Sequence, residues 1–138
     1  MDEVGTSKAQ YFENGKVMHI DCRNEGTKPK RHRNSEKMSL LQWNIERGYK
    51  LPGILDELKG IDADIICLQE IDVGCERSGN IDTGLAIATE LKLNYVYFEE
   101  FEELKSPLRT EKTQGGGTHG NGIFTKWNVS DIQLVKHR

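Results

Sequence analysis

Two polar residues stand near the ends of segments that are predicted as strands, where side chains can form a site. Asn44 lies near the end of the segment 40–45, and Glu70 directly follows the segment 64–69. If these strands are neighbours in one sheet, their carboxyl ends bring an amide and a carboxylate together at one edge. One hard carboxylate supported by amide oxygens and water is a common way to hold Mg²⁺. The pattern therefore suggests a small metal site, although spacing alone fits an exposed strand-end acid at Glu70 more often.

Arg77 and His119 are further candidates for chemistry. Arg77, in the sequence Glu76-Arg77-Ser78-Gly79, could clamp a phosphate oxygen beside a metal ion or form an ordinary surface ion pair with Glu76. His119 follows a glycine-rich stretch and could act as a ligand or transfer a proton, although a loop histidine usually does neither. The glycines at 115–117 do not form a phosphate-binding P-loop, because they precede a predicted strand and lack the following Lys-Ser/Thr.

The elements that must position these residues alternate between strand and helix. Apolar and polar residues alternate over 40–45, which predicts a strand. Over 51–60 the apolar residues recur three and four positions apart between Pro52 and Gly60, which predicts a helix. The same reasoning predicts a buried strand over 64–69, a helix over 81–91, strands over 94–98, 122–126 and 129–135, and a loop over 104–120. This order predicts a layered α/β domain whose last two strands pair in an antiparallel or mixed manner.

The first 37 residues are expected to form a disordered or weakly ordered, partly basic extension of a domain that spans 38–138. Apolar residues are sparse in this extension. The alternative is a short hairpin that turns at Asn14-Gly15. The run Lys28-Pro29-Lys30-Arg31-His32-Arg33 fits a solvated basic linker, and the alternatives are a nuclear import signal or a nucleic-acid patch.

Composition limits the functional classes. The chain has 138 residues, enough for one domain with its own core, and a net charge of −3. Residues 38–138 carry eleven Lys and Arg against sixteen Asp and Glu, unlike a surface that coats DNA nonspecifically. The longest apolar run, 65–68, falls far short of the ~18–20 residues of a membrane helix. Three cysteines without a zinc spacing favour a reducing compartment, so we expect an intracellular protein, cytoplasmic or nuclear.

Four motifs in order resemble the endonuclease/exonuclease/phosphatase family, the DNase I-like fold. They are Leu41-Gln42-Trp43-Asn44-Ile45, Leu68-Gln69-Glu70-Ile71-Asp72, Glu76-Arg77-Ser78-Gly79 followed by Asp82, and Gly120-Asn121-Gly122-Ile123-Phe124-Thr125-Lys126. The resemblance implies a four-layer α/β/β/α sandwich and a phosphoesterase or nuclease-like hydrolase that depends on Mg²⁺ or Mn²⁺.

The resemblance also implies roles for individual residues. Glu70 corresponds to the glutamate that holds Mg²⁺ in the family, and Asn44 to the asparagine that borders metal and phosphate. Arg77 lies in a segment that often faces the substrate, and Asn121 begins a strand beneath the site. We therefore take Glu70 and Asn44 as catalytic candidates, with Glu70 as metal ligand, and Arg77, Asn121 and His119 as substrate-binding candidates.

The departures from the family pattern matter as much as the match. The Gly-Asp-x-Asn and Ser-Asp-His segments, which in the family supply the water-activating base and the catalytic histidine, are absent; Ser130-Asp131 is followed by Ile132. We therefore expect 38–138 to be the N-terminal half of a DNase I-like domain, weakly active or inactive alone. The alternatives are a non-catalytic truncated product that serves as a binding or regulatory module, and a nucleic-acid-binding basic tail on an inert domain.

The expected partners follow from this interpretation. The substrate would be a phosphoester of the nucleic-acid, phospholipid or nucleotide type, and the residues do not decide among them. Half of a sandwich leaves one sheet face without its partner layer, so we also expect self-association through that exposed face.

Overall fold

The computed structural model describes residues 8–29 and 37–137. Its strands are β1 (Gln10–Phe12), β2 (Val17–Asp21), β3 (Leu40–Asn44), β4 (Ile65–Val73), β5 (Asn94–Glu102) and β6 (Thr118–Thr125). Its α-helices are α1 (Leu51–Ile61) and α2 (Thr83–Leu91), and short 3-10 turns occupy Glu13–Gly15, Glu46–Gly48 and Glu76–Ser78. No helix within these described residues is long and apolar enough to span a bilayer.

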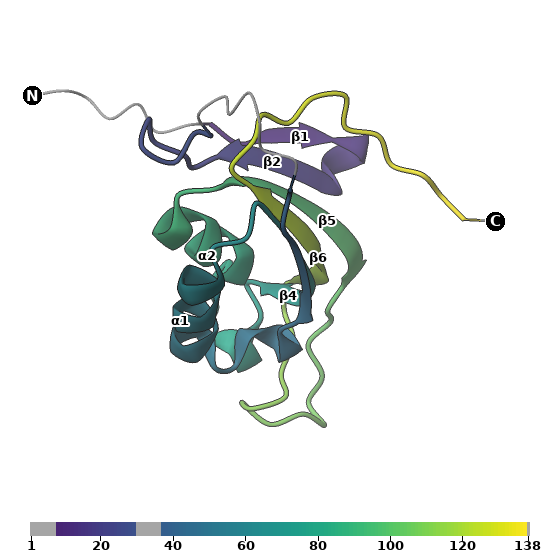
Figure 1. Ribbon diagram of the computed structural model, residues 1–138. Helices are drawn as coiled ribbons and strands as arrows, with labels where there is room; N and C mark the ends of the chain where they lie inside the picture. The colour runs from purple at the N-terminus through teal and green to yellow at the C-terminus, as the bar shows by residue number, and fades with distance from the viewer. Residues whose placement is uncertain (1–7, 30–36, 138) are drawn as a thin grey trace, which may run out of the picture.

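The strands form a six-stranded mixed sheet in the order β1-β2-β5-β6-β4-β3. β3 and β4 are parallel and are connected through α1, whereas the other neighbouring strands pair in an antiparallel manner. Both helices cover the same face of the sheet (Figure 1). The chain therefore forms an α/β domain with one sheet layer and one helix layer, consistent with part of a DNase I-like sandwich.

A hydrophobic core fills the space between the helices and the sheet. Its buried side chains include Ile54 and Leu58 of α1, Ile87 and Ala88 of α2, Ile66, Leu68 and Ile71 of β4, Tyr95 and Tyr97 of β5, and Phe124 of β6. The rings of Tyr95 and Phe124 stack with their centroids 4.4 Å apart. A Cβ atom on Gly84 would lie only 1.9 Å from Oη of Tyr95, so this glycine lets α2 pack directly on the sheet. The helix layer thus fixes the central strands that lead to the candidate site.

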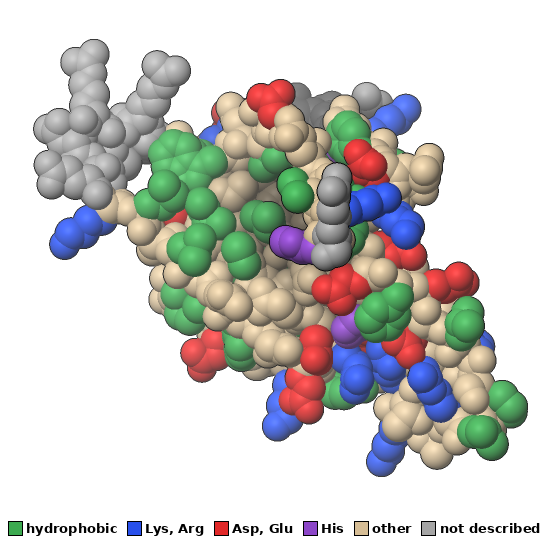
Figure 2. Space-filling view, turned by 90° about the vertical axis from the view of Figure 1, so that its right-hand side faces the viewer, with side chains coloured by type: hydrophobic (Ala, Val, Ile, Leu, Met, Phe, Trp, Pro, Cys, Tyr) green, Lys and Arg blue, Asp and Glu red, His purple; other side chains and the backbone are tan. Residues whose placement is uncertain are grey.

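The opposite face of the sheet has no helix on it and is the face shown in Figure 2. Strand alternation places Leu40 of β3 and Ile123 of β6 on this face, where they are 65% and 49% exposed. In Figure 2, acidic and basic side chains mix in the lower part of the view, where the loop between β5 and β6 protrudes. The open face therefore combines exposed apolar side chains with a charged end.

The last predicted strand is wrong: residues 129–135 form no strand in the structure. β6 already pairs with β5 on one side and with β4 on the other. A strand following a tight turn after β6 would need a free edge beside it, and neither edge of β6 is free. β6 also begins at Thr118, so the preceding loop is shorter than predicted.

Part of the N-terminal extension belongs to the sheet. β1 and β2 form an antiparallel hairpin with Phe12 opposite Val17, and β2 pairs with β5 over its whole length. Val17 and Met18 are buried. The composition of residues 1–37 predicts weak order because it does not reveal that β5, far along the chain, offers these side chains a partner. The basic run at 28–33 lies mostly outside the described residues.

Candidate active site at the ends of two parallel strands

The parallel pairing of β3 and β4 brings Asn44 and Glu70 to the same edge of the sheet. Asn44 ends β3 opposite Gln69 of β4, and Glu70 is the next residue along β4. The local sequence forms this arrangement because apolar residues alternate along β3 and are continuous in the buried first half of β4. Asn44 and Glu70 therefore lie in adjacent register positions, as predicted, but β4 continues to Val73, so Glu70 lies inside its strand and not at the end.

Glu70 lies in a β-bulge. The register of β4 against β6 shifts between Leu68, which faces Gly122, and Ile71, which faces Gly120, so Gln69 and Glu70 together face Asn121. The backbone of Glu70 is left-handed, with φ of 58°. Such a conformation costs roughly 1–3 kcal/mol in a non-glycine residue and is characteristic of functional sites. Bulges next to active sites redirect a side chain, so this one gives Glu70 an orientation that regular alternation would not.

Asn44 is held by the backbone that follows it. Its Oδ1 accepts a hydrogen bond from the backbone N–H of Glu46 at 3.0 Å. Glu46 and Arg47 both adopt left-handed backbone conformations, with φ of 49° and 60°. The amide of Asn44 is therefore fixed by a strained turn directly after β3.

Asn121 stands opposite the bulge and is tied to an acid that the sequence analysis missed. Its Nδ2 donates a hydrogen bond to Oε1 of Glu100 on β5. The sequence alone does not single out Glu100, because only the pairing of β5 with β6 shows that it reaches Asn121. The bulge at Glu70 therefore lies opposite an amide that a second carboxylate, Glu100, holds.

Asp72 is the centre of a buried polar cluster next to this edge. It is 0% exposed, and its carboxylate accepts two hydrogen bonds from Arg77, at 2.8 Å from Nε and 2.9 Å from Nη2. Ser78 Oγ donates to it at 3.0 Å, and Nδ1 of His119 lies 2.7 Å from Oδ1. Burial opposes ionisation, but the hydrogen bonds from Arg77, His119 and Ser78 outweigh it and lower the pKa of the Asp72 carboxyl. Because Asp72 is ionised, Nδ1 of His119 carries the proton and donates it to this hydrogen bond.

Arg77 faces the interior instead of forming a surface pair with Glu76. Its side chain is 5% exposed and also donates from Nη2 to Glu103 at 3.2 Å. Hydrogen bonding to Asp72 raises the pKa of the guanidinium further above its usual value. The two sequence candidates Arg77 and His119 therefore meet on Asp72, while Asn44, Glu70 and Asn121 occupy neighbouring register positions on β3, β4 and β6.

The donor set at the strand ends suits a hard divalent cation but does not form a closed cage. Glu70 offers a carboxylate and Asn44 an amide oxygen, which are the kinds of ligand that Mg²⁺ prefers. Within residues 8–29 and 37–137, no group of three or more His, Cys, Asp and Glu side chains could hold a metal ion. The residues present therefore fit an ion that keeps most of its water ligands.

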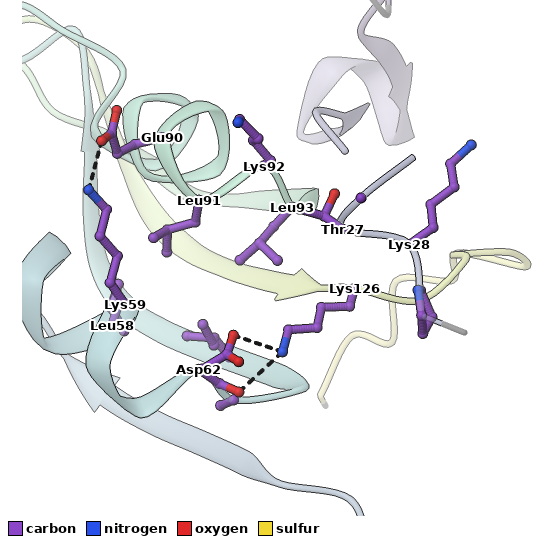
Figure 3. A pocket seen from close by; sticks show the side chains of 14 residues that line it. Thr27, Lys28, Leu58, Lys59, Asp62, Glu90, Leu91, Lys92, Leu93 and Lys126 are labelled. Carbon is purple, nitrogen blue, oxygen red and sulfur yellow. Dashed lines mark hydrogen bonds and ion pairs between the residues drawn. The ribbon is translucent and has the colours of Figure 1, made fainter. Parts of the chain in front are cut away.

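Two cavities differ in their relation to this edge. One, of about 550 Å³, lies near the start of β4 and the C-terminal ends of α1 and α2. Figure 3 shows that lysines lining it pair with acids: Lys59 Nζ lies 2.8 Å from Glu90 Oε1, and Lys126 Nζ lies 2.8 Å from Asp62 Oδ1. The other, of about 230 Å³, is lined by Arg47, Tyr49, Arg77, Arg109 and Thr113 and lies beside the strand ends. The smaller cavity is the one near the candidate site.

The family model described as "Endonuclease/Exonuclease/phosphatase family" matches residues 41–136. The chain belongs to the endonuclease/exonuclease/phosphatase family. No curated protein and no solved structure gives a significant match. Membership in this family confirms the resemblance found in the sequence motifs and indicates the fold of phosphoesterases and nuclease-like hydrolases. The matched range includes both strand ends, so the candidate site lies within the family domain.

Proposed function

We propose that the strand-end edge is the metal and phosphate site of a hydrolase that cleaves phosphoester bonds with a divalent cation. The observation that supports this most strongly is the bulge that turns Glu70 out of register next to Asn44. A buried, hydrogen-bonded Asp72 supports the strand two residues further on. The family to which the chain belongs acts on phosphoesters such as nucleic acids, and it generally depends on divalent metal ions.

Each residue of the edge has a separate task in this proposal. Mg²⁺ or Mn²⁺, when bound, would polarise a phosphoryl oxygen and stabilise developing negative charge. Glu70 holds the cation with its carboxylate, and Asn44 orients the phosphate with an amide that the turn after β3 already fixes. Asn121, oriented by Glu100, contacts the substrate from the strand opposite the bulge.

The substrate class is a phosphoester of nucleic-acid, phospholipid or nucleotide type. An intracellular location, cytoplasmic or nuclear, remains part of the proposal and is supported by the free thiols of Cys22, Cys67 and Cys75. Self-association through the open sheet face stays a prediction, based on the exposure of Leu40 and Ile123.

A second candidate function is a binding or regulatory module without turnover. It is favoured by the donor set, because the described residues do not gather three acidic, histidine or cysteine side chains around one point. In this case the edge would bind cation and phosphate loosely but would not activate water.

Hydrolysis of a generic phosphodiester, with and without a chelator, tests the proposal. We expect the chain to show at most trace turnover that needs Mg²⁺ or Mn²⁺, and Glu70→Gln to abolish it, because the amide keeps the shape but not the charge. Asn44→Ala should lower turnover while changing metal affinity less. The matched control is Glu57→Gln, which removes an exposed acid of α1. Turnover that resists the chelator, or that survives Glu70→Gln, would refute the assignment.

A further inference from the structure

Three arginines from separate segments meet in the 230 Å³ cavity beside the strand ends, which we call the arginine pocket. Its lining is Arg47, Tyr49, Arg77, Arg109 and Thr113. Arg47 follows Asn44 by three residues, Arg77 follows Glu70 by seven, and Arg109 comes from the loop between β5 and β6. A pocket lined by three guanidinium groups next to a proposed phosphate site is suited to an anion.

The guanidinium groups keep donors that have no acceptor among the described residues. Each has five N–H groups. Arg77 donates to Asp72 and Glu103 through Nε and Nη2, and Arg109 donates to Glu103 and Leu104 through Nη1. Within residues 8–29 and 37–137, no acceptor is found for Nη1 of Arg77 or for Nε and Nη2 of Arg109. The pocket can therefore form additional hydrogen bonds without breaking its own.

Arg47 gives the clearest sign that an acceptor is missing. Its Nε is buried and has no hydrogen-bond partner in the described part of the chain, and its Nη1 makes one bond of 3.3 Å to Oη of Tyr49. Leaving a buried donor unpaired costs about 1–3 kcal/mol, more for a charged group. A phosphate oxygen is the acceptor that a guanidinium binds best, because two parallel N–H groups match two oxygens.

The backbone holds Arg47 in place before any ligand arrives. Glu46 and Arg47 are both left-handed, and the hydrogen bond from Glu46 N–H to Asn44 Oδ1 stabilises the turn. A Cβ atom on Gly48 would lie 2.4 Å from Cγ2 of Thr83, so the turn packs directly on α2. Arg47 also lies over the ring of Tyr49, 6.0 Å from its centroid. The left-handed turn therefore orients the guanidinium group of Arg47 toward the pocket.

Charge and volume indicate which anion fits. The carboxylates of Asp72 and Glu103 pair with Arg77 and Arg109, so Arg47 remains as excess positive charge in a chain of net charge −3. The volume lies below the ~300–1,000 Å³ of pockets for drug-sized ligands and leaves room for a phosphate group, which the three guanidinium groups favour.

We propose that the arginine pocket binds a phosphate group of the substrate other than the one that is hydrolysed. This inference rests on the proposed function for the scissile phosphate. It narrows the substrate class to molecules with at least two phosphates, such as a polynucleotide or an inositol polyphosphate. A phosphodiester with a single phosphate would leave the pocket without its ligand.

Calorimetric titration of the full chain with inorganic pyrophosphate in chelator tests the pocket without any need for turnover. Arg47→Gln should weaken binding at least about tenfold, which is the loss of about 1.4 kcal/mol. Arg47→Lys should also weaken it, because the lysine keeps the charge but not the paired donors. Lys50→Gln and Lys112→Gln are matched controls, since both lysines are exposed and neither lines the pocket. Equal losses in Arg47→Gln and the controls, or no binding of pyrophosphate at millimolar concentration, would overturn the proposal.

Two further experiments identify the kind of molecule that carries the phosphate and distinguish this inference from the proposed function. A 5′-phosphorylated dinucleotide and an inositol bisphosphate are titrated in the same way, and the one whose affinity falls in Arg47→Gln identifies the source. If neither affinity falls, the inference is wrong. Glu70→Gln should keep pyrophosphate binding in chelator but lose Mn²⁺ binding. Normal Mn²⁺ binding by Glu70→Gln would refute the proposed function and leave the arginine pocket intact.

Discussion

The two ends of β4 handle charge in opposite ways. Near its start, the larger cavity is lined by lysines that pair with acids on the surface, as Lys59 does with Glu90 (Figure 3). Near its end, Asp72 and Arg77 pair in the interior. Glu70, two residues before Asp72, has a left-handed backbone conformation. The first region keeps its charged groups at the surface, whereas the second holds charged groups in the interior.

This difference shows that the larger cavity is not the better candidate for the functional site. The larger cavity contains several lysines and an apolar floor, but its ion pairs are those of an ordinary surface. The smaller arginine pocket lies next to a strained turn, a buried unpaired donor and a bulged glutamate. Buried charge and a buried donor without a partner among the described residues mark the functional end, because each is costly unless the site uses it.

Removing the buried carboxylate should give the largest effect. Asp72→Ala leaves Arg77 buried with Glu103 as its remaining acid, so we expect a loss of about 3 kcal/mol in the free energy of unfolding. Urea denaturation followed by circular dichroism measures this loss. Asp56→Ala, which removes an exposed acid of α1, is the control and should change stability by less than about 0.5 kcal/mol. A loss no larger than that of the control would mean that the strand end does not depend on this pair.

Acid should weaken the strand-end region through the same carboxyl. The folded pKa of Asp72 lies below the ordinary value of 3.8. Its contribution to stability is therefore complete above pH 3.8 and is lost as the pH falls through the folded pKa. Unfolding midpoints between pH 7 and pH 2 should fall more steeply for the wild-type chain than for Asp72→Asn, which cannot titrate at this position. Parallel curves would show that other groups control acid unfolding.

The lysine cavity should give the smallest effect. Lys59→Gln removes an exposed ion pair with Glu90, and we expect no measurable shift of the urea midpoint because exposed pairs are screened by water and salt. The same measurement on Asp72→Ala provides the scale. A shift in Lys59→Gln comparable to that of Asp72→Ala would remove the contrast between the two ends of β4.

Hydrophobic periodicity predicted the strands and helices whose formation depends mainly on their own sequence. Alternation over 40–45 and the helical spacing over 51–60 correspond to β3 and α1, and the parallel pairing of β3 with β4 places Asn44 opposite Gln69, one residue before Glu70. The strand expected over 129–135 does not form, and β1 and β2 appear where weak order was expected. Both differences depend on which sheet edges are free, and a single segment carries no information about that.

The details of the site were hidden for a similar reason. The bulge at Glu70 depends on the register between β4 and β6, and the bond of Asn121 to Glu100 depends on the pairing of β5 with β6. Arg77 was expected beside a phosphate or on the surface, yet its nearest partner is Asp72, five residues earlier and turned inward. Residue types could name the candidates, but only the sheet register shows which of them meet.

Paramagnetic broadening by Mn²⁺ in ¹H–¹⁵N spectra of the chain tests the central claim most directly. The account predicts that amide signals of Asn44, Glu70 and Asn121 broaden first, and that Glu70→Gln removes this pattern while Glu57→Gln leaves it unchanged. Signals near the lysine cavity, such as those of Leu58 and Leu93, should remain sharp at the same Mn²⁺ concentration. Broadening that centres elsewhere, or that persists in Glu70→Gln, would contradict the assignment of the strand-end edge as the metal site.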